Sequence, residues 1–189
     1  MDYQITRIDT LHEGWCKLVV ATIRTPKGEV LRREIEDHGT AVAVLAYDPD
    51  RRVAMLVRQF RPSAFHAAGQ TEILETIAGL VEEDEPAAEA ARREAMEETG
   101  LRLGDLELVA TTWTSPGLST ERIGLFLAPF ARRDRVAEGG GAEDEQEDIT
   151  LVETPLAELA ARADAGAIDD LKLLALVQTL RLRRPELFG

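Results

Sequence analysis

Three glutamates near the middle of the chain have a spacing that could bind a metal ion. Glu94, Glu97 and Glu98 stand at positions i, i+3 and i+4, which share one face of an α-helix. Like charges at these spacings weaken a helix by roughly 0.2–0.5 kcal/mol per pair, so a cation is expected to offset them. Carboxylate oxygens suit hard divalent cations such as Mg²⁺ or Mn²⁺. A solvated acidic face without a ligand is the alternative interpretation.

The segment that contains these glutamates is predicted to be a helix over residues 86–99. Pro86 suits the first helical turn, and the many alanines of the segment are the strongest helix formers. Gly100 suits the left-handed residue that ends a helix. A stripe of small apolar residues beside the carboxylates can lie flat against a sheet, and it consists of Ala88, Ala91 and Ala95.

The same stretch, residues 79–101, resembles the Nudix box, the sequence signature of the Nudix hydrolases. The box reads G-x5-E-x7-R-E-U-x-E-E-x-G-U, where U is an apolar residue, and every fixed position matches. The matching residues are Gly79, Glu85, Arg93, Glu94, Ala95, Glu97, Glu98, Gly100 and Leu101. Ala95 is smaller than the isoleucine, leucine or valine that is usual at its position. A match of this length is far more specific than a lone glycine-rich motif.

Length and composition favour one globular domain of ordinary size. The chain has 189 residues, of which 44% are hydrophobic and 30% are charged, enough to bury a core. The net charge of −13 argues against nonspecific binding to nucleic acid or to an anionic membrane. It does not exclude a phosphorylated substrate, because bound cations can reverse the local field.

The single cysteine and the distribution of apolar residues suggest a cytoplasmic protein. Cys16 has no partner for an internal disulfide, and its strand-like surroundings favour a small core residue over a nucleophile. No apolar stretch approaches the roughly 18 residues of a membrane span, and the first residues lack the pattern of a signal peptide.

Patterns of apolar and β-branched residues predict an alternation of strands with a few helices. Strands are expected over residues 3–9, 15–24, 29–36, 41–47, 53–60, 72–77, 105–113, 122–128 and 149–153. Loops are expected over residues 63–69, 114–121 and 131–147. Besides the box helix, helices are expected from Pro155 to Ala165 and from Asp170 to Arg184, the second with an apolar stripe.

The first 40 residues are predicted to form a β unit of their own. Strands within residues 1–40 are joined by short turns, while residues 41–189 contain the box and the helices. A β unit of about 40 residues is too small to be stable alone. We therefore expect residues 1–40 to lie at an interface, in a homodimer formed through the N-terminal strands.

The order of elements resembles the Nudix fold, which implies an α/β protein: an α/β/α sandwich around a mixed β-sheet in residues 41–189, with a small N-terminal antiparallel β unit. Features outside the box are similar to the branch that hydrolyses nucleoside-diphosphate sugars, which includes ADP-ribose pyrophosphatases and GDP-mannose hydrolases. They are Arg-Gln-Phe-Arg at 58–61, Ser115-Pro116-Gly117 and an acidic run before Ile149. The glycine run at 139–141 and Arg32-Arg33-Glu34 resemble the GDP-mannose subgroup.

The Nudix resemblance implies a metal site on the box helix. Its ligands would be Glu94, Glu98 and the backbone carbonyl of Ala78, with Glu97 in the same cluster. Catalytic roles are implied for Glu97 and Glu98. Arg93 and Glu85 would pair and hold the preceding loop against the helix.

The acidic loop contributes two further residues by resemblance. Glu147 resembles an additional metal ligand, and Glu145 resembles a catalytic base. The segment between the glycine run and Ile149 is longer here than in the GDP-mannose subgroup, so the assignment between the two glutamates stays open. A solvated acidic linker is the alternative.

Substrate contacts are implied at Arg32, Arg33, Arg61, Glu121 and Lys172. A planar guanidinium matches the geometry of phosphate oxygens. The alternatives are an ion pair with the abundant acidic residues for Arg58 and Arg61, a helix-surface lysine for Lys172 and a strand-edge charge for Glu121.

The implied activity is hydrolysis of the diphosphate bond in a nucleoside-diphosphate sugar of the GDP-mannose or ADP-ribose type, dependent on Mg²⁺ or Mn²⁺. Its products would be a nucleoside monophosphate and a sugar phosphate. The partner would be this small molecule, with no nucleic acid and no membrane. The alternatives are a Nudix hydrolase of another nucleoside diphosphate derivative or triphosphate, and a non-catalytic Nudix-fold regulator. All the box carboxylates are present, which argues against the regulator.

Overall fold

The structure is a computed structural model that describes residues 2–141 and 148–189. The chain forms two compact units. One, the N-terminal unit, comprises residues 1–41 and 112–123, and the other, the main unit, comprises residues 42–111 and 124–189. The segment 112–123, distant in sequence, therefore belongs with the N-terminal strands.

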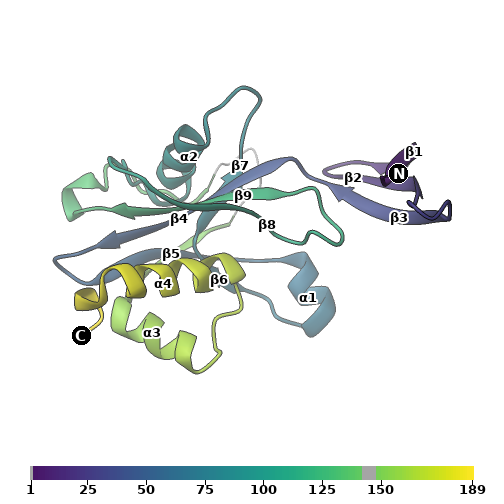
Figure 1. Cartoon of the computed structure of the whole chain (residues 1–189). Helices are drawn as coiled ribbons and strands as arrows, with labels where there is room; N and C mark the ends of the chain where they lie inside the picture. Colours follow the sequence, from purple (N-terminus) through teal and green to yellow (C-terminus); the bar gives the residue numbers. More distant parts are fainter. Residues whose placement is uncertain (1, 142–147) are drawn as a thin grey trace. The chain divides into compact units, whose positions relative to one another are not determined.

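The N-terminal unit is built on a three-stranded sheet in the order β1-β2-β3, with antiparallel neighbours (Figure 1). The strands are β1 (Gln4–Glu13), β2 (Lys17–Arg24) and β3 (Val30–Asp37). The turn between β2 and β3 contains Gly28 at φ 86°, a backbone conformation that glycine adopts without strain. The end of β3 also pairs with the loop at 114–121, since the Glu36 amide donates to the Leu118 carbonyl and the Glu36 carbonyl accepts from the Thr120 amide, both at 2.9 Å.

A seven-stranded sheet forms the centre of the fold, with a main path β10-β5-β4-β9-β8. Its strands are β4 (Thr40–Asp48), β5 (Val53–Gln59), β6 (Ile73–Glu75), β7 (Ile77–Leu80), β8 (Glu107–Trp113), β9 (Arg122–Pro129) and β10 (Thr150–Pro155). Off the main path, β6 pairs with β5 and β7 pairs with β4. The predicted hairpin between β4 and β5 is confirmed, with Ala46 opposite Met55.

Helices cover both faces of the sheet in the main unit, so the predicted α/β/α sandwich is confirmed (Figure 1). Helix α2 (Ala87–Thr99) lies on one face, and α3 (Leu156–Asp164) with α4 (Leu171–Arg183) on the other. On the α2 side, a buried core includes Val44, Met55, Ala91 and Ala95. Successive strand residues point to opposite faces, so Leu45 and Leu56, also fully buried, serve the α3–α4 side.

The alanine stripe of α2 packs as expected. Ala91 and Ala95 have no exposed surface, and Ala88 is half-buried against the same core. Because these side chains are small, the helix axis can lie close to the sheet. Gly100 ends α2 in the left-handed conformation at φ 70°, and its amide donates to Met96.

One predicted loop was wrong. Residues within 63–69 form most of helix α1 (Pro62–Ala68), which begins with a proline in its first turn and ends at Gly69 with φ 70°. The helix is seven residues long and contains no buried residue. Its sequence therefore lacks the apolar periodicity from which a helix is predicted. Two short 3₁₀ helices, η1 (Arg132–Asp134) and η3 (Pro185–Leu187), complete the elements described. Within residues 2–141 and 148–189, none of the helices has both the length and the apolar character needed to cross a membrane.

Candidate active site

The three glutamates of α2 range from the surface into the core. The Glu97 side chain is 41% exposed and that of Glu94 is 14% exposed, while Glu98 as a whole is 1% exposed. Burying a carboxylate is costly unless cations or hydrogen bonds compensate. A merely solvated acidic face would leave all three side chains in water, so the gradient of burial favours a binding site over that alternative.

Gly79 in β7 makes room for one of these carboxylates. A Cβ atom at this position would overlap the carboxylate of Glu94. The backbone of β7 therefore approaches α2 closely at Gly79, and Ala78 is the preceding residue of the same strand. This close approach explains physically why glycine stands here.

Arg93 joins the carboxylates to the loop before the helix. Its guanidinium donates to both carboxylate oxygens of Glu85 at 3.1 Å, to Oε1 of Glu94 at 2.8 Å and to Oε2 of Glu97 at 3.0 Å. It also donates to the carbonyl of Leu80 at 2.9 Å. The hydrogen bonds from Arg93 hold the pKa of Glu85 below its ordinary value. The predicted pair between Arg93 and Glu85 is confirmed, and the same arginine offsets part of the repulsion along α2.

The glycine run at 139–141 caps the carboxyl end of α2. The Gly140 amide donates to the Glu98 carbonyl at 2.8 Å, and the Gly141 amide donates to the Glu97 carbonyl at 3.2 Å. Gly139 has φ 75°, and a Cβ there would lie 2.6 Å from the Glu98 carbonyl oxygen. The last four carbonyls of a helix have no partner within it, so this segment supplies donors that the helix needs. The sequence predicts only a loop over residues 131–147, because these contacts use backbone atoms that leave no mark on residue type.

A second cluster of charged residues surrounds Glu75 at the end of β6. Arg61 donates to both Glu75 carboxylate oxygens, at 2.6 and 3.0 Å. The Lys172 ammonium lies 3.2 Å from Glu75 and 2.8 Å from Asp170. Asp170 is the N-cap of α4 and also accepts from the Thr76 amide at 3.3 Å. We call Arg61, Glu75, Asp170 and Lys172 the Glu75 network; it ties the start of α4 to the strand that leads into the box.

In the Glu75 network, hydrogen bonds and opposite charges change the pKa values of Glu75 and Lys172 more than burial does. Burial alone would raise the pKa of Glu75, but Arg61 and Lys172 lower it below its ordinary value. Burial would lower the pKa of Lys172, yet Asp170 and Glu75 raise it. Glu75 and Lys172 are therefore both charged at neutral pH.

The comparisons with known proteins agree with this geometry. A family model described as "NUDIX domain" matches residues 37–177. The chain belongs to the Nudix family. Its Nudix box is the segment from Gly79 to Leu101, and the box glutamates are those gathered on α2.

Curated relatives cover most of this Nudix protein. A protein named GDP-mannose pyrophosphatase from Cronobacter sakazakii is 41% identical over 159 residues, which are 82% of each chain. Proteins of the same name from Citrobacter koseri and Escherichia coli O157:H7 are 37% and 35% identical, over 81% and 82% of this chain and 80% and 81% of theirs. A solved structure titled "Crystal structure of ADP compounds hydrolase" superposes with a TM-score of 0.78 at 18% identity, covering 98% of this chain and 96% of that one, and supports the Nudix fold.

The structure distributes the remaining predicted residues over both units. Arg61 and Lys172 belong to the Glu75 network of the main unit. Glu121 belongs to the N-terminal unit, where its amide donates to the Ser119 hydroxyl at 3.1 Å. Glu145 and Glu147 lie outside the described residues.

Arg32 and Arg33 stand on β3, opposite Thr22 and Ala21 of β2. Both are exposed, and as neighbours on a strand they point to opposite faces of the N-terminal sheet. A single bound molecule on one face of this sheet could therefore meet only one of the two side chains. The sequence motif alone did not distinguish them.

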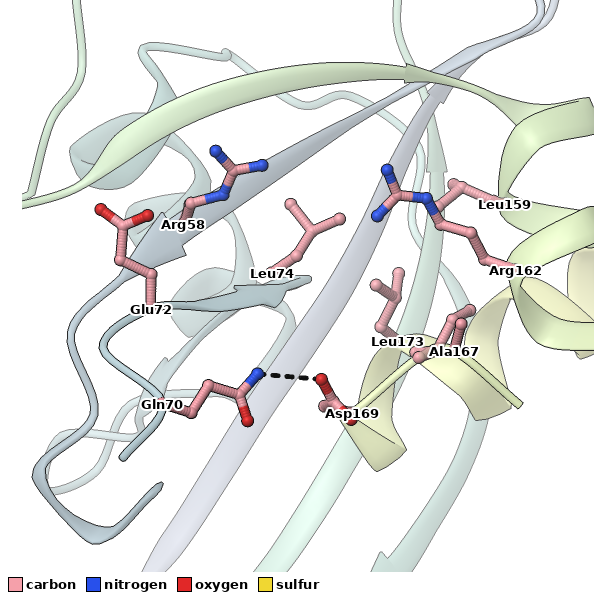
Figure 2. A pocket seen from close by; sticks show the side chains of 10 residues that line it. Arg58, Gln70, Glu72, Leu74, Leu159, Arg162, Ala167, Asp169 and Leu173 are labelled. Atoms are coloured by element: carbon pink, nitrogen blue, oxygen red, sulfur yellow. Dashed lines mark hydrogen bonds between the residues drawn. The ribbon is translucent and has the colours of Figure 1, made fainter. Parts of the chain in front are cut away.

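Arg58 lies apart from the Nudix box glutamates. It lines a polar pocket together with Gln70, Glu72, Leu74, Leu159, Arg162, Ala167, Ile168, Asp169 and Leu173 (Figure 2). Gln70 donates to Asp169 across this pocket at 2.9 Å. Because α3 and α4 supply part of the lining, the pocket is on the sheet face opposite α2. Arg58 and Arg61, close in sequence, thus have different surroundings.

Gly79→Ala is expected to displace the Glu94 carboxylate without unfolding the protein. The added methyl group would displace the Glu94 carboxylate, and a side-chain end can move aside at little cost to the backbone. We expect the Mg²⁺ concentration for half-maximal activity to rise by about 10- to 100-fold, while the free energy of unfolding changes by less than about 1 kcal/mol. Gly104→Ala is the matched control, since a Cβ at Gly104 meets nothing within 4 Å. An unchanged Mg²⁺ dependence in Gly79→Ala would contradict the placement of Glu94.

Gly139→Ala should weaken the cap on the Nudix helix more than Gly140→Ala does. Both glycines have positive φ, but only a Cβ at Gly139 meets the backbone of α2. Each variant places alanine at a positive φ that it rarely adopts, at a cost of about 1–3 kcal/mol, and Gly139→Ala adds the displacement of the loop. We expect Gly139→Ala to melt ~2–4 °C lower than Gly140→Ala and to have the lower kcat of the two. Equal melting temperatures and rates for the two variants would refute the capping role.

Proposed function

We propose that this protein hydrolyses the diphosphate bond of a nucleoside-diphosphate sugar, with GDP-mannose as the preferred substrate and Mg²⁺ as the preferred cation. The observation that carries the proposal is the group of Nudix box carboxylates on α2, graded from exposed Glu97 to buried Glu98. The choice of GDP-mannose is supported by the names of the curated relatives, which cover four fifths of the chain.

The donor set fits a hard divalent cation. Glu94, Glu98 and the carbonyl of Ala78 are the proposed ligands, with Glu97 beside them, and all of these donors are oxygens, which Mg²⁺ and Mn²⁺ prefer. A bound divalent cation neutralises the diphosphate and lowers the pKa of a coordinated water. Glu97 and Glu98 are the proposed catalytic residues of α2. Glu145 and Glu147, outside the described residues, stay predicted as base and further ligand.

Arg93 has a positioning role in this proposal. It donates to Glu94 and Glu97, and it fixes the loop before α2 through Glu85. Arg93, itself bonded to Glu85, therefore orients both carboxylates before any cation arrives, which reduces the entropy lost on binding.

Arg61 and Lys172 are proposed to hold the phosphates of the substrate. The Arg61 side chain is 39% exposed while it is bonded to Glu75, and a guanidinium matches the geometry of phosphate oxygens. Glu75 would orient Arg61, and Lys172 would add positive charge beside it. Either Arg32 or Arg33, which point to opposite faces of the N-terminal sheet, stays predicted as a contact to the rest of the substrate, and so does Glu121.

The proposal is tested with a panel of GDP-mannose, GDP-glucose, ADP-ribose, ADP-glucose and NADH, each with Mg²⁺ and with EDTA. We expect GDP-mannose to give the highest kcat/KM, with GMP and mannose phosphate as products, and EDTA to abolish turnover. Similar kcat/KM values for the whole panel would refute the preference, and turnover in EDTA would refute the metal dependence.

A homodimer through the N-terminal strands is also proposed. The sheet of the N-terminal unit exposes several large apolar side chains, each more than half accessible: Tyr3, Ile5, Ile8, Leu11, Trp15 and Val30. Covering such side chains with a second copy would remove apolar surface from water. We expect sedimentation to give the mass of a dimer, and Ile8→Glu to shift it towards the monomer. Lys27→Glu, in the turn between β2 and β3, is the control. A monomeric wild-type protein would contradict this proposal.

The cytoplasmic location and the absence of nucleic-acid and membrane partners stay predictions.

A further inference from the structure

A second group of metal-binding side chains lies in the N-terminal unit, outside the Nudix box. Cys16, Glu36 and His38 each offer one donor atom, and these three atoms lie within 4.8 Å of one another. Nε2 of His38 is 2.9 Å from Oε1 of Glu36, and Sγ of Cys16 is 4.0 Å from the same oxygen. All three residues are half-buried. The proposed hydrolysis uses none of them.

The strand register explains why the three side chains converge. Lys17 pairs with Asp37 at the open end of the β2–β3 hairpin. Cys16 directly precedes β2, and His38 directly follows β3, so the two residues flank the last pair of this ladder. Glu36 lies in β3, one residue before that pair. The ends of the two strands therefore bring the three side chains into one neighbourhood.

The surrounding structure holds this end of the hairpin in place. The backbone of Glu36 is bonded to the loop at 114–121 on the side away from β2, and the Thr120 hydroxyl donates to Asp37 at 2.6 Å. The ring of Trp15 meets the His38 ring edge-on, with centroids 4.7 Å apart. Ligands fixed in this way lose little freedom when they bind an ion.

We propose that Cys16, Glu36 and His38 form a binding site for Zn²⁺ or a similar transition-metal ion. A tetrahedral zinc ion with bonds of about 2.0–2.3 Å to sulfur, nitrogen and oxygen requires donors about 3.3–3.6 Å apart. The donors here would each move by about 1 Å, which side-chain rotation provides. A set containing thiol and imidazole selects Zn²⁺ over Mg²⁺, so this site and the carboxylates of α2 take different ions. The thiol of Cys16 gives its proton to solvent when the ion binds.

Such an ion would link the start of β2 to the end of β3, and water would occupy its fourth coordination position. It binds the folded sheet and not the separated strands, so it stabilises the N-terminal unit by mass action. The sequence favours a small core residue at position 16, whereas Cys16 is half-buried and is a metal ligand in this proposal.

The test is titration of the purified full-length protein with Co²⁺ and with Zn²⁺ in millimolar Mg²⁺, which keeps the box carboxylates occupied. We expect one Co²⁺ per chain with an intense near-ultraviolet thiolate-to-cobalt band, displaced by Zn²⁺. Cys16→Ser should abolish the band. Glu36→Gln and His38→Gln should weaken binding at least tenfold, because even residues that only orient a ligand contribute about 10- to 100-fold. His12→Gln, which changes a histidine of neighbouring β1 outside the cluster, is the control.

The titrations distinguish a metal site from a chance grouping of three side chains. Absence of the thiolate band in the wild-type protein would overturn the proposal, and so would Zn²⁺ affinities that are equal in the wild type and the three ligand variants. Circular dichroism of each variant shows that a lost band does not come from unfolding. Hydrolysis is not part of the readout, so failure of the zinc site and failure of the proposed activity can be told apart.

Discussion

Glu98→Gln is expected to abolish hydrolysis while the protein stays folded. The substitution preserves the shape of a side chain that is 1% exposed, but it removes the charge that a divalent cation requires. We expect kcat to fall by about 10³-fold, equivalent to about 4 kcal/mol of transition-state stabilisation. Steady-state rates with the best substrate of the panel, at saturating Mg²⁺, measure the effect.

Glu89→Gln is the matched control for this prediction. Glu89 lies on the same helix, is exposed and pairs with Arg92 at 2.8 Å. The control should retain wild-type turnover, and both variants should keep the wild-type circular dichroism. Turnover by Glu98→Gln within a few-fold of the wild type would remove Glu98 from the catalytic residues.

Glu75→Gln is expected to produce the largest loss of stability. The carboxylate is 4% exposed and faces both Arg61 and Lys172, so the neutral amide leaves two cations without their shared partner. Breaking a buried ion pair costs about 3–5 kcal/mol. We expect the lower end of this range, because the Arg61 side chain is 39% exposed and can be solvated. Urea denaturation at pH 7 measures the change, with Glu72→Gln, an exposed residue of the same segment, as the control.

The pH dependence of this loss follows from the direction of the pKa shifts. The pKa of Glu75 is lowered from 4.5, so its contribution is complete above about pH 4.5 and is lost as the pH falls through the lower folded-state value. The pKa of Lys172 is raised from 10.5, so its contribution persists below that pH and is lost only as the pH rises through the higher folded-state value. The stability difference between wild type and Glu75→Gln should therefore be constant from pH 5 to pH 9 and shrink below pH 4. A difference that does not change between pH 7 and pH 3 would contradict this account.

Elements with strong local signals were predictable from the sequence. Helix α2 has alanines, a proline at its start and Gly100 at its end, and the structure begins it one residue later than predicted because Pro86 has an extended ψ of 136°. The strands β4 and β5 are apolar and bounded by a turn, and their hairpin is as expected. Helix α1 was missed because it is short and fully outside the core, so burial imposes no pattern on it.

Contacts of the candidate site that lie within the sequence motif could be predicted from the sequence. Contacts between residues far apart in the sequence could not. The pair of Arg93 and Glu85 spans eight residues and follows from the box. Arg61 bonds to Glu75, which lies 14 residues away, and Lys172 reaches the same carboxylate across 97 residues. No local pattern encodes such contacts. The role of the glycine run was also hidden, because its contacts to α2 use backbone atoms.

The attachment of the glycine run to α2 has a consequence for how this protein can vary. Gly140 and Gly141 bind the helix through their main-chain amides, so the attachment does not depend on side-chain identity in the following acidic run. It does depend on the number of residues between η1 and the glycine run, because an added or deleted residue would shift each amide away from its carbonyl. Substitutions in the acidic run should thus be tolerated far better than insertions or deletions before it.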